Sequence, residues 1–195
     1  MNFEKLRQEK GGKDDLLTGE ERFSLRRSVA GILLAAAAAV VLFLVFSVFF
    51  RVAVISGASM EPTLLNRDLT VVQVFDYKPA QADIVVIRTG GGQDRAIVKR
   101  VIALGGQSVD IDFVTGGVYV DGHKLWEPYL SEPTKLAYDV TFPVTVPEGY
   151  VFIMGDNRNH SVDSRSSQTG MIPVENIQGK VVWRLFPLSR MGAVG

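Results

Sequence analysis

The longest apolar stretch of the chain covers residues 28–50, an uncharged run rich in alanine, valine, leucine and phenylalanine. About 20 such residues in an α-helix are enough to span the hydrocarbon core of a bilayer. The run is apolar on every face, whereas a helix that packs on a protein core keeps a polar face. A cleavable signal peptide is the alternative, but the run is longer than a usual leader, and no clear small-x-small cleavage site follows Phe50. The pattern predicts one transmembrane helix over residues 28–50.

Beyond this run, the hydrophobic positions gather in short stretches of β-branched and aromatic residues, at residues 69–75, 83–88, 150–154 and 180–185. Sequences with glycine or proline separate the stretches, which is typical of strands joined by turns. Asp121-Gly122 lies between Val118-Tyr119-Val120 and His123-Lys124-Leu125 and is a strong signal for a two-residue hairpin. No long amphipathic helical pattern intervenes. Residues 51–195 are therefore predicted to form one mostly antiparallel β domain, barrel-like or folded over on itself.

Positively charged residues are distributed unevenly around the predicted membrane span. Before the span lie Lys5, Arg7, Lys10, Lys13, Arg22, Arg26 and Arg27. Between the span and residue 70, the chain has only Arg51 and Arg67. Because lysine and arginine are retained on the cytoplasmic side, residues 1–27 are predicted to be a cytoplasmic tail, polar and mostly disordered. Residues 51–195 are then an exported domain behind a single-pass anchor in the cytoplasmic membrane.

The composition excludes several classes of chemistry. The chain of 195 residues has no cysteine, two histidines and a formal net charge of zero. Without cysteine there is no disulfide framework, no thiolate nucleophile and no cysteine metal site. Two histidines without a paired-acid motif do not suit a zinc site, so we expect no metal and no cofactor. A neutral chain with no dense basic run is not expected to bind nucleic acid.

Two polar residues lie in segments suited to nucleophilic chemistry. Ser59 ends a turn of small residues, Ser-Gly-Ala-Ser at positions 56–59. Lys99 lies inside an apolar stretch, where strand alternation places Ile97 and Val101 on its face. A serine hydroxyl needs a base to take its proton, and a lysine serves as that base when burial disfavours its ammonium form. Each residue alone also fits a simpler interpretation, Ser59 as an ordinary turn residue and Lys99 as a solvent-facing one.

A third polar segment covers residues 155–165, directly after a predicted strand. It contains Ser161, Asp163 and Arg165, and the last two have the chemistry for a short bidentate pair that braces a site. The simpler interpretation is a solvated loop, because Gly-Asp-Asn at its start favours a turn.

The two histidines are weaker candidates. His160 lies in the same polar segment and is an alternative base for a Ser-His arrangement. It has no obvious carboxylate to orient it that a lysine mechanism would not use better. His123 lies beside the predicted hairpin and is expected on the surface. We therefore favour Lys99 over His160 as the base.

Three blocks together resemble the type I signal peptidases, the bacterial leader peptidase family. They are Ser-Gly-Ala-Ser-Met-Glu-Pro-Thr-Leu at residues 56–64, Ile-Val-Lys-Arg-Val-Ile-Ala-Leu-Gly at residues 97–105, and Gly-Asp-Asn-Arg-Asn-His-Ser-Val-Asp-Ser-Arg at residues 155–165. Asp-Ile-Val-Val-Ile at residues 83–87 is similar to the family's strand between the first two blocks. Their order behind a membrane span is specific. Gly57 stands where some members have a serine that donates to the oxyanion, so the chain looks like the short, Gram-positive-like form.

The resemblance implies a role for each matching residue. Ser59 is the expected nucleophile, Lys99 the general base, and the backbone N–H of Ser59 a donor of the oxyanion hole. Ser161 is expected to hydrogen-bond the lysine amine and aim it, with Asp163 and Arg165 as a supporting pair.

The activity that the resemblance implies is a serine endopeptidase that removes N-terminal signal peptides from exported preproteins. It would act outside the cytoplasmic membrane of a bacterium, with preproteins and the lipid bilayer as partners. The family prefers small residues beside the cleavage site, which fits shallow apolar pockets, and an extended peptide pairs with a strand edge. We expect that edge and those pockets among Asp83, Ile84, Val85, Val86, Ile87, Ile97 and Val98.

Two other functions stay open from the sequence. A Ser-Lys protease of the self-cleaving repressor type has a similar β fold, but it predicts a DNA-binding N-terminal domain where this chain has a membrane span. A non-enzymatic exported β domain would display a binding surface and would not depend on Ser59 or Lys99. Incubation of the purified protein with a preprotein separates the three possibilities.

Overall fold

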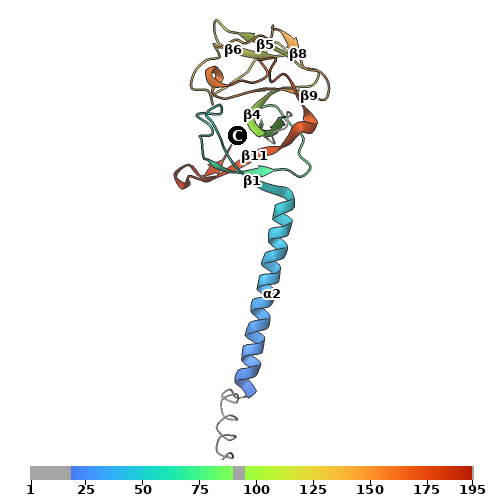
Figure 1. Cartoon of the computed structure of the whole chain (residues 1–195), viewed down its shortest axis with the longest axis vertical. Coiled ribbons are helices and arrows are strands. Elements are labelled where there is room, and N and C mark those ends of the chain that lie inside the picture. Colours follow the sequence, from blue (N-terminus) through green and yellow to red (C-terminus); the bar gives the residue numbers. More distant parts are fainter. Residues whose placement is uncertain (1–18, 90–94, 195) are drawn as a thin grey trace, which may run out of the picture. The chain divides into compact units, whose positions relative to one another are not determined.

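The computed structural model describes residues 19–89 and 95–194 of the chain (Figure 1). The chain divides into two compact units, Met1–Ser47 and Val48–Gly195. The prediction of a disordered tail concerns residues 1–27, of which 1–18 lie outside the described residues. All strands of the described residues belong to the second unit.

Helix α2, Gly19–Phe49, contains most of the predicted membrane span. Its part Phe23–Phe49 is long and apolar enough to cross a membrane, judged by length and composition. The helix ends at Phe49 because Phe50 opens the first strand. It begins earlier than predicted, so residues 19–27 are helical and not disordered. The physical reason is that glutamate and arginine favour helices, and a helix adds residues at little cost once it has formed.

The second unit is built on an eight-stranded sheet in the order β1-β2-β11-β3-β4-β9-β10, with β12 paired to β11. Its strands are β1 (Phe50–Val54), β2 (Leu69–Gln73), β3 (Ile84–Thr89), β4 (Arg95–Leu104), β9 (Tyr150–Met154), β10 (Ile172–Pro173), β11 (Ile177–Phe186) and β12 (Gly192–Ala193). Every pairing in it is antiparallel. Register shifts in β11 and β4 bend the sheet. The predicted mostly antiparallel β fold is confirmed.

A smaller sheet of four strands has the order β7-β6-β5-β8. The strands are β5 (Ser108–Asp112), β6 (Gly117–Val120), β7 (His123–Lys124) and β8 (Val144–Thr145), at the end of the domain away from β1 (Figure 1). The predicted hairpin is confirmed, because Asp121 and Gly122 join β6 to β7. Both have a positive φ, 50° and 77°, as this kind of turn requires.

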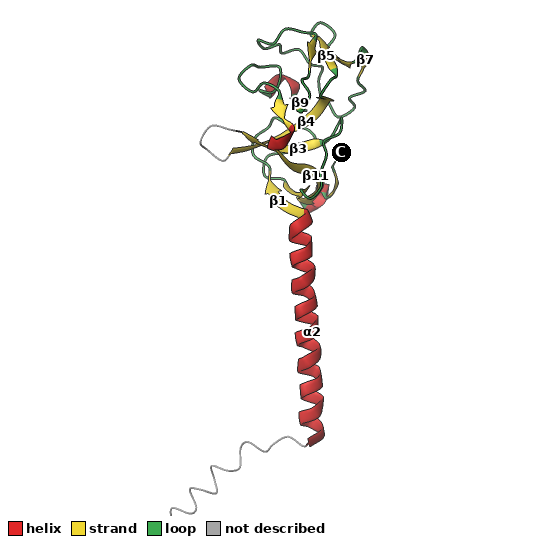
Figure 2. Cartoon of the chain, turned by 90° about the vertical axis from the view of Figure 1, so that its right-hand side faces the viewer, coloured by secondary structure: helices red, strands yellow, loops and turns green. Residues whose placement is uncertain are grey.

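The remaining helical segments of the described residues are short 3-10 turns (Figure 2). They are η1 (Arg158–His160), η2 (Val174–Asn176) and η3 (Leu188–Arg190). Two long loops connect distant parts of the fold. One covers residues 125–143 between β7 and β8, and the other covers residues 155–171 between β9 and β10. We call them the β7–β8 loop and the β9–β10 loop.

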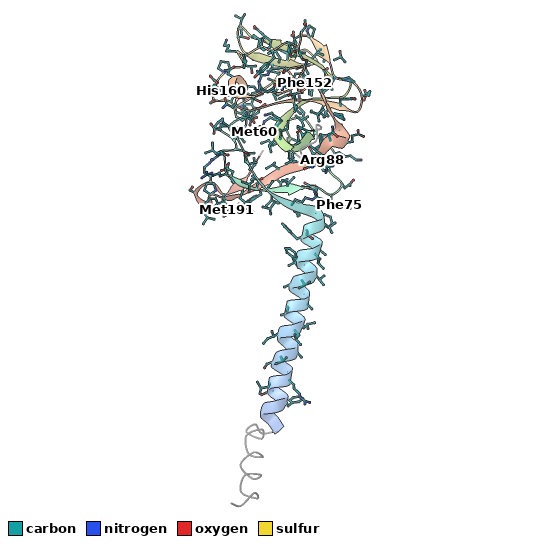
Figure 3. The ribbon with its side chains drawn as sticks, in the orientation of Figure 1. Met60, Phe75, Arg88, Phe152, His160 and Met191 are labelled. Atoms are coloured by element: carbon teal, nitrogen blue, oxygen red, sulfur yellow. The ribbon has the colours of Figure 1, made fainter. Side chains whose placement is uncertain are left out.

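The core consists of three clusters of buried side chains. One cluster joins the two sheets and contains Phe152 of β9 (Figure 3). The other two lie on opposite sides of β3, because strand alternation sends successive side chains to opposite faces. Ile84 and Val86 pack in one of them, and Val85 and Ile87 pack in the other. β3 is therefore buried on both faces.

β3 also lies inside the sheet, between β11 and β4. It pairs with β11 at residues 85–87 and with β4 along its whole length. Residues 85–87 therefore offer no free strand edge to a peptide, because both of their backbone edges are paired. β4 pairs with β9 only from Arg100 onward. Along Ile97 and Val98, its edge away from β3 has no partner strand in the described part of the chain.

Candidate active site

Ser59 lies in the loop between β1 and β2. The loop is closed by a hydrogen bond from the Ile55 N–H to the Asp68 carbonyl (2.9 Å). Met60 and Leu64 anchor it, because both side chains are buried in a cluster that also contains residues of β3. Ser59 itself is half-buried. The packing of Met60 and Leu64 thus holds the backbone around Ser59 in place.

The β9–β10 loop also contacts the loop that carries Ser59, residues 55–68, which we call the Ser59 loop. Asn157 donates its backbone N–H to the Ser59 carbonyl (3.0 Å) and its side-chain Nδ2 to the Ala58 carbonyl (3.1 Å). Gly155 packs so closely that a Cβ at this position would collide with the Ser59 carbonyl oxygen and with Ser161 Oγ. The first and third blocks of the sequence therefore form one unit in space.

The backbone N–H of Ser59 donates to no protein acceptor within residues 19–89 and 95–194. A free N–H at a serine nucleophile is the donor that an oxyanion hole requires. Gly57, two residues earlier, has a φ of 94°, which favours glycine, and donates its N–H to Asn66 Oδ1 (3.1 Å). This position supplies no hydroxyl group.

Lys99 lies on β4 opposite Val85 and is 4% exposed. As alternation predicts, Ile97 and Val101 pack in the same cluster as Val85. Burial lowers the pKa of Lys99 from 10.5 to about 8, because an apolar environment disfavours the ammonium form, while the nearby Asp163 carboxylate opposes the shift. A substantial fraction of the amine is therefore neutral near pH 8.

The Lys99 side chain lines a groove of about 600 Å³. Apolar residues of the wall include Ile97 from β4, Val162 and Met171 from the β9–β10 loop, and Ile172 from β10. A ligand in this groove can thus reach the lysine although most of its side chain is buried.

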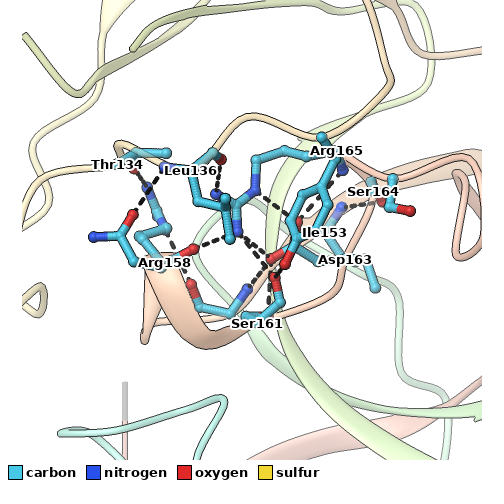
Figure 4. Close-up of polar contacts among 12 residues, drawn as sticks. Thr134, Leu136, Ile153, Arg158, Ser161, Asp163, Ser164 and Arg165 are labelled. Atoms are coloured by element: carbon cyan, nitrogen blue, oxygen red, sulfur yellow. Dashed lines mark hydrogen bonds and ion pairs between the residues drawn. The ribbon is translucent and has the colours of Figure 1, made fainter. Parts of the chain in front are cut away.

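The β9–β10 loop contains a dense hydrogen-bond network around Asp163 (Figure 4). The buried Asp163 carboxylate accepts hydrogen bonds from the Gly155 N–H (3.0 Å) and Ser161 Oγ (2.9 Å). Arg165 donates Nε to Oδ1 (2.8 Å) and Nη2 to Oδ2 (2.9 Å). The expected bidentate pair of Asp163 and Arg165 therefore forms. The simpler interpretation of a solvated loop is wrong for these residues, which are all buried.

Both histidines are exposed, and Figure 3 shows His160 at the periphery of the domain. The prediction that His123 is a surface residue is confirmed. His160 donates its backbone N–H to the Asn157 carbonyl (3.0 Å). Among the described residues, no carboxylate forms a hydrogen bond or ion pair with the His160 ring, so this side chain has no such group to orient it as a base.

Sequence reasoning missed a buried ion pair beside Lys99. Arg100 donates Nε and Nη2 to the two oxygens of Asp156 (2.8 and 2.7 Å), and Thr63 Oγ1 donates to the same carboxylate (2.5 Å). Asp156 therefore ties the Ser59 loop to β4. The signal was available, because an arginine inside an apolar strand needs a buried counter-charge.

Ser59 and Lys99 both approach the β9–β10 loop. The Ser59 backbone contacts Gly155 and Asn157, and Lys99 interacts electrostatically with Asp163. The parts of the chain that the structure describes contain no hydrogen bond between the Ser59 hydroxyl and the Lys99 amine. They also contain no group of three or more His, Cys, Asp or Glu side chains that could hold a metal ion. The arrangement offers a serine, a partly neutral lysine and a rigid polar support.

Comparisons with known proteins identify the family of the chain. The family model described as signal peptidase, peptidase S26, matches residues 26–186. The chain belongs to the type I signal peptidase family. It is 42% identical over 151 residues to the probable signal peptidase I-1 of Synechocystis sp., which covers 72% of this chain and 74% of that protein. It is 35% identical over 185 residues to signal peptidase I S of Bacillus subtilis, which covers 88% of this chain and 96% of that protein.

A crystal structure of a signal peptidase I from Enterococcus faecalis is also similar, with 29% sequence identity and a TM-score of 0.46. The similarity covers 53% of this chain and 97% of that chain. All three blocks of this signal peptidase fall inside the residues that the family model matches. The blocks that meet around the β9–β10 loop are thus part of the region that the chain shares with the family.

Asp163→Asn is expected to destabilise this signal peptidase by roughly 3–5 kcal/mol, because the buried Arg165 loses its counter-charge. Urea unfolding measures the change. The carboxylate also raises the pKa of Lys99, so its loss should lower that pKa further. Asp110→Asn, at an exposed position of β5, is the matched control and should change neither quantity. An Asp163→Asn protein with wild-type stability would contradict the bracing role.

Proposed function

We propose that this signal peptidase is a membrane-anchored serine endopeptidase that removes N-terminal signal peptides from exported preproteins, with Ser59 as nucleophile and Lys99 as general base. The observation that carries the proposal is the burial of Lys99 with a pKa of about 8, beside the loop that binds the Ser59 backbone. A lysine with this pKa is partly neutral at ordinary working pH, and only the neutral amine can accept a proton.

The reaction follows from these two groups. The Lys99 amine takes the proton of the Ser59 hydroxyl as its oxygen attacks the carbonyl carbon of the scissile bond. The Ser59 N–H stabilises the negative oxygen that develops. The Lys99 ammonium then gives its proton to the departing amine, and the signal peptide stays on Ser59 as an ester. Water attacks this ester with Lys99 again as base, which releases the signal peptide and restores the hydroxyl.

The β9–β10 loop supplies the supporting residues. Ser161 Oγ donates its proton to Asp163, so its lone pairs are left for the Lys99 amine. Arg165 holds Asp163 in place through two hydrogen bonds. This order of contacts favours a lysine aimed by Ser161.

The free edge of β4 is the best support for substrate binding. An extended peptide can pair there along Ile97 and Val98, next to Lys99. Val98 packs on the same cluster as Val86 and Ala53, and β1 is also an edge strand. Shallow pockets over this cluster would accept small side chains and exclude larger ones by steric clash. In this view Val86 serves through its side chain only, because its backbone is already paired.

The anchor proposal rests on α2 and on the distribution of charge. Phe23–Phe49 is long and apolar enough to span a bilayer, and lysine and arginine are more frequent before it than directly after it. We propose a single-pass protein of the bacterial cytoplasmic membrane, with residues 1–27 in the cytoplasm and residues 51–195 outside. Such tethering raises the effective concentration of the site where cleavage sites emerge.

The proposal is tested by incubating the purified full-length protein, in detergent, with one preprotein and sequencing the new N-terminus. Cleavage between the signal peptide and the mature region is expected, and Ser59→Ala should not cleave. A wild-type protein that binds the preprotein without cleaving it would support a display domain. Cleavage of this chain itself, with the preprotein left intact, would support the self-cleaving alternative.

Activity is expected to rise with pH from neutral through about 8 and then level off, as the Lys99 ammonium loses its proton. Below that pKa the neutral fraction falls about tenfold per pH unit, and kcat/KM should follow it. The rate of preprotein cleavage measured across this range gives the profile. A rate that falls between neutral pH and 8 would contradict Lys99 as the base.

A further inference from the structure

Glu127 is a buried carboxylate that lies outside the three sequence blocks. It belongs to the β7–β8 loop, and its side chain is 8% exposed. Arg158 donates Nη2 to its Oε1 (2.5 Å) and Nη1 to its Oε2 (3.3 Å), and the Tyr129 hydroxyl donates to Oε1 (2.9 Å). Burying a carboxylate is costly unless such partners are present, so Glu127 is stable at this buried position only with Arg158 as its counter-charge.

The rest of the β7–β8 loop also contacts the β9–β10 loop (Figure 4). Several further contacts join them. Among them, Arg158 Nη1 donates to Thr134 Oγ1 (2.9 Å), Arg165 Nη1 donates to the Leu136 carbonyl (2.8 Å), and the Tyr138 hydroxyl donates to the Ser161 carbonyl (3.0 Å). The loop that extends from the smaller sheet is thus bound directly to the segment that carries Ser161 and Asp163.

Glu127 completes a balance of charge. The buried arginines of the described residues are Arg100, Arg158 and Arg165, and each has one carboxylate partner: Asp156, Glu127 and Asp163 respectively. Two of these carboxylates come from the third block, and Glu127 comes from the β7–β8 loop. Tyr129, which bonds Glu127, also stacks on Arg100, with the guanidinium 3.8 Å from the ring centroid. Tyr129 therefore connects the Arg158–Glu127 pair with the Arg100–Asp156 pair.

Arg158 connects Glu127 to Gly155. Its Nε donates to the Gly155 carbonyl (3.0 Å). Gly155 in turn donates its N–H to Asp163 and lies against Ser161 Oγ and the Ser59 carbonyl. A guanidinium is planar, so the bonds that Glu127 accepts on one side fix the direction of the Nε bond on the other. The place of Gly155 thus depends on Glu127.

We propose that Glu127 is a positioning residue for the peptidase reaction. Its carboxylate neutralises the buried Arg158 and, through Arg158, holds Gly155 in place. The proposal rests on the proposed role of Lys99 as base. Without the carboxylate, Arg158 would be an unpaired buried charge and would no longer hold Gly155, whose N–H bonds Asp163. A displaced Asp163 would raise the pKa of Lys99 less, which favours the neutral amine. The Gly155 carbonyl would also lose its fixed donor.

The test is the Glu127→Gln variant of the full-length protein in detergent, assayed with a preprotein. We expect kcat to fall on the order of 10-fold or more with little change in KM, because a displaced base slows the chemical step and not binding. The rising limb of the pH profile should move to lower pH. Amide hydrogen exchange of residues 155–165 should be faster. Glu127→Asp keeps the charge, so the rising limb of its pH profile should return to the wild-type pH.

Two controls separate positioning from simple stability. Glu132→Gln removes an exposed carboxylate from the same loop and should leave kcat, the limb and the exchange unchanged. Thr134→Val removes the neutral acceptor of Arg158. It should speed amide hydrogen exchange of residues 155–165 without moving the rising limb of the pH profile.

The proposal is overturned if Glu127→Gln keeps the wild-type kcat per folded molecule and the rising limb of its pH profile stays at the wild-type pH. A lower melting temperature of this variant would not change that conclusion. Should Glu127→Gln not fold, Glu127→Asp decides in its place: a kcat below that of Glu132→Gln supports the proposal, and a wild-type kcat overturns it. An active Lys99→Ala variant would remove Lys99 as the base, and the hydrogen exchange would still report whether Glu127 holds the β9–β10 loop.

Discussion

Lys99→Arg is expected to abolish preprotein cleavage, with a fall in kcat of roughly 10⁴-fold or more, because members of a catalytic unit fail together. Arginine keeps the positive charge and much of the length of lysine, but its guanidinium does not lose a proton at working pH. The initial rate of cleavage, with folding checked by circular dichroism, measures the effect. An active Lys99→Arg variant would show that the base is another group. Lys124→Arg, at an exposed position of β7, is the control and should keep full activity.

Lys99→Met separates the role of Lys99 in activity from its effect on stability. The pKa of Lys99 is about 8 in the folded protein and 10.5 as a free side chain, so the native state binds protons less well than the unfolded chain. The ammonium form then costs stability at every pH below about 8, and this cost disappears as pH rises from about 8 to 10.5. The cost is about 3 kcal/mol when the lysine is fully protonated in both states.

Lys99→Met is therefore expected to be inactive yet at least as stable as the wild type at neutral pH, since methionine fills a similar volume without a charge. Thermal unfolding at neutral and alkaline pH measures this. The advantage of the variant should shrink as pH rises toward 10.5. A Lys99→Met protein that is clearly less stable than wild type at neutral pH would contradict the buried, partly neutral lysine.

Gly155→Ala is expected to lower activity on the order of 100-fold or more, because atoms of the site must move apart to admit a methyl group. The added Cβ would collide with Ser161 Oγ and with the Ser59 carbonyl, which belong to the two segments that the reaction must hold together. The Ser59 carbonyl is backbone and cannot rotate away. The variant should also lose roughly 1–3 kcal/mol of stability through overpacking. Cleavage rate and urea unfolding measure the two effects.

A matched control for this change is Gly31→Ala in α2. An added Cβ there meets nothing within 4 Å, so neither rate nor stability should fall. Wild-type activity of Gly155→Ala would mean that the close approach of Gly155 to Ser59 and Ser161 does not matter for the reaction.

Much of the site was readable from local sequence. The alternation around Lys99 predicted apolar neighbours, and Ile97 and Val101 do pack in its cluster. Asp163 and Arg165, two residues apart, form the expected pair. The hairpin at Asp121-Gly122 also formed as predicted. These signals succeed because each depends on the conformation of a few consecutive residues, which side-chain chemistry and backbone preferences control directly.

Other features depended on which strands become neighbours. The sequence showed that residues 83–87 form an apolar strand, but an apolar strand can lie at an edge or in the centre of a sheet. Only the fold placed β3 between β11 and β4 and left the edge of β4 free beside Lys99. Strand order is set by the packing of whole faces and not by the residues of one strand, so periodicity could not reveal it.

The sequence by itself determined which groups are available: a serine on a small-residue turn, a lysine in an apolar strand, and a polar loop, behind an apolar helix. The tertiary structure decided how these parts are held. Glu127 and Arg158 are 31 residues apart, and Arg100 and Asp156 are 56 residues apart, yet each pair is buried in contact. Their charges need a partner once water is removed, and only the folded chain determines which partner is within reach.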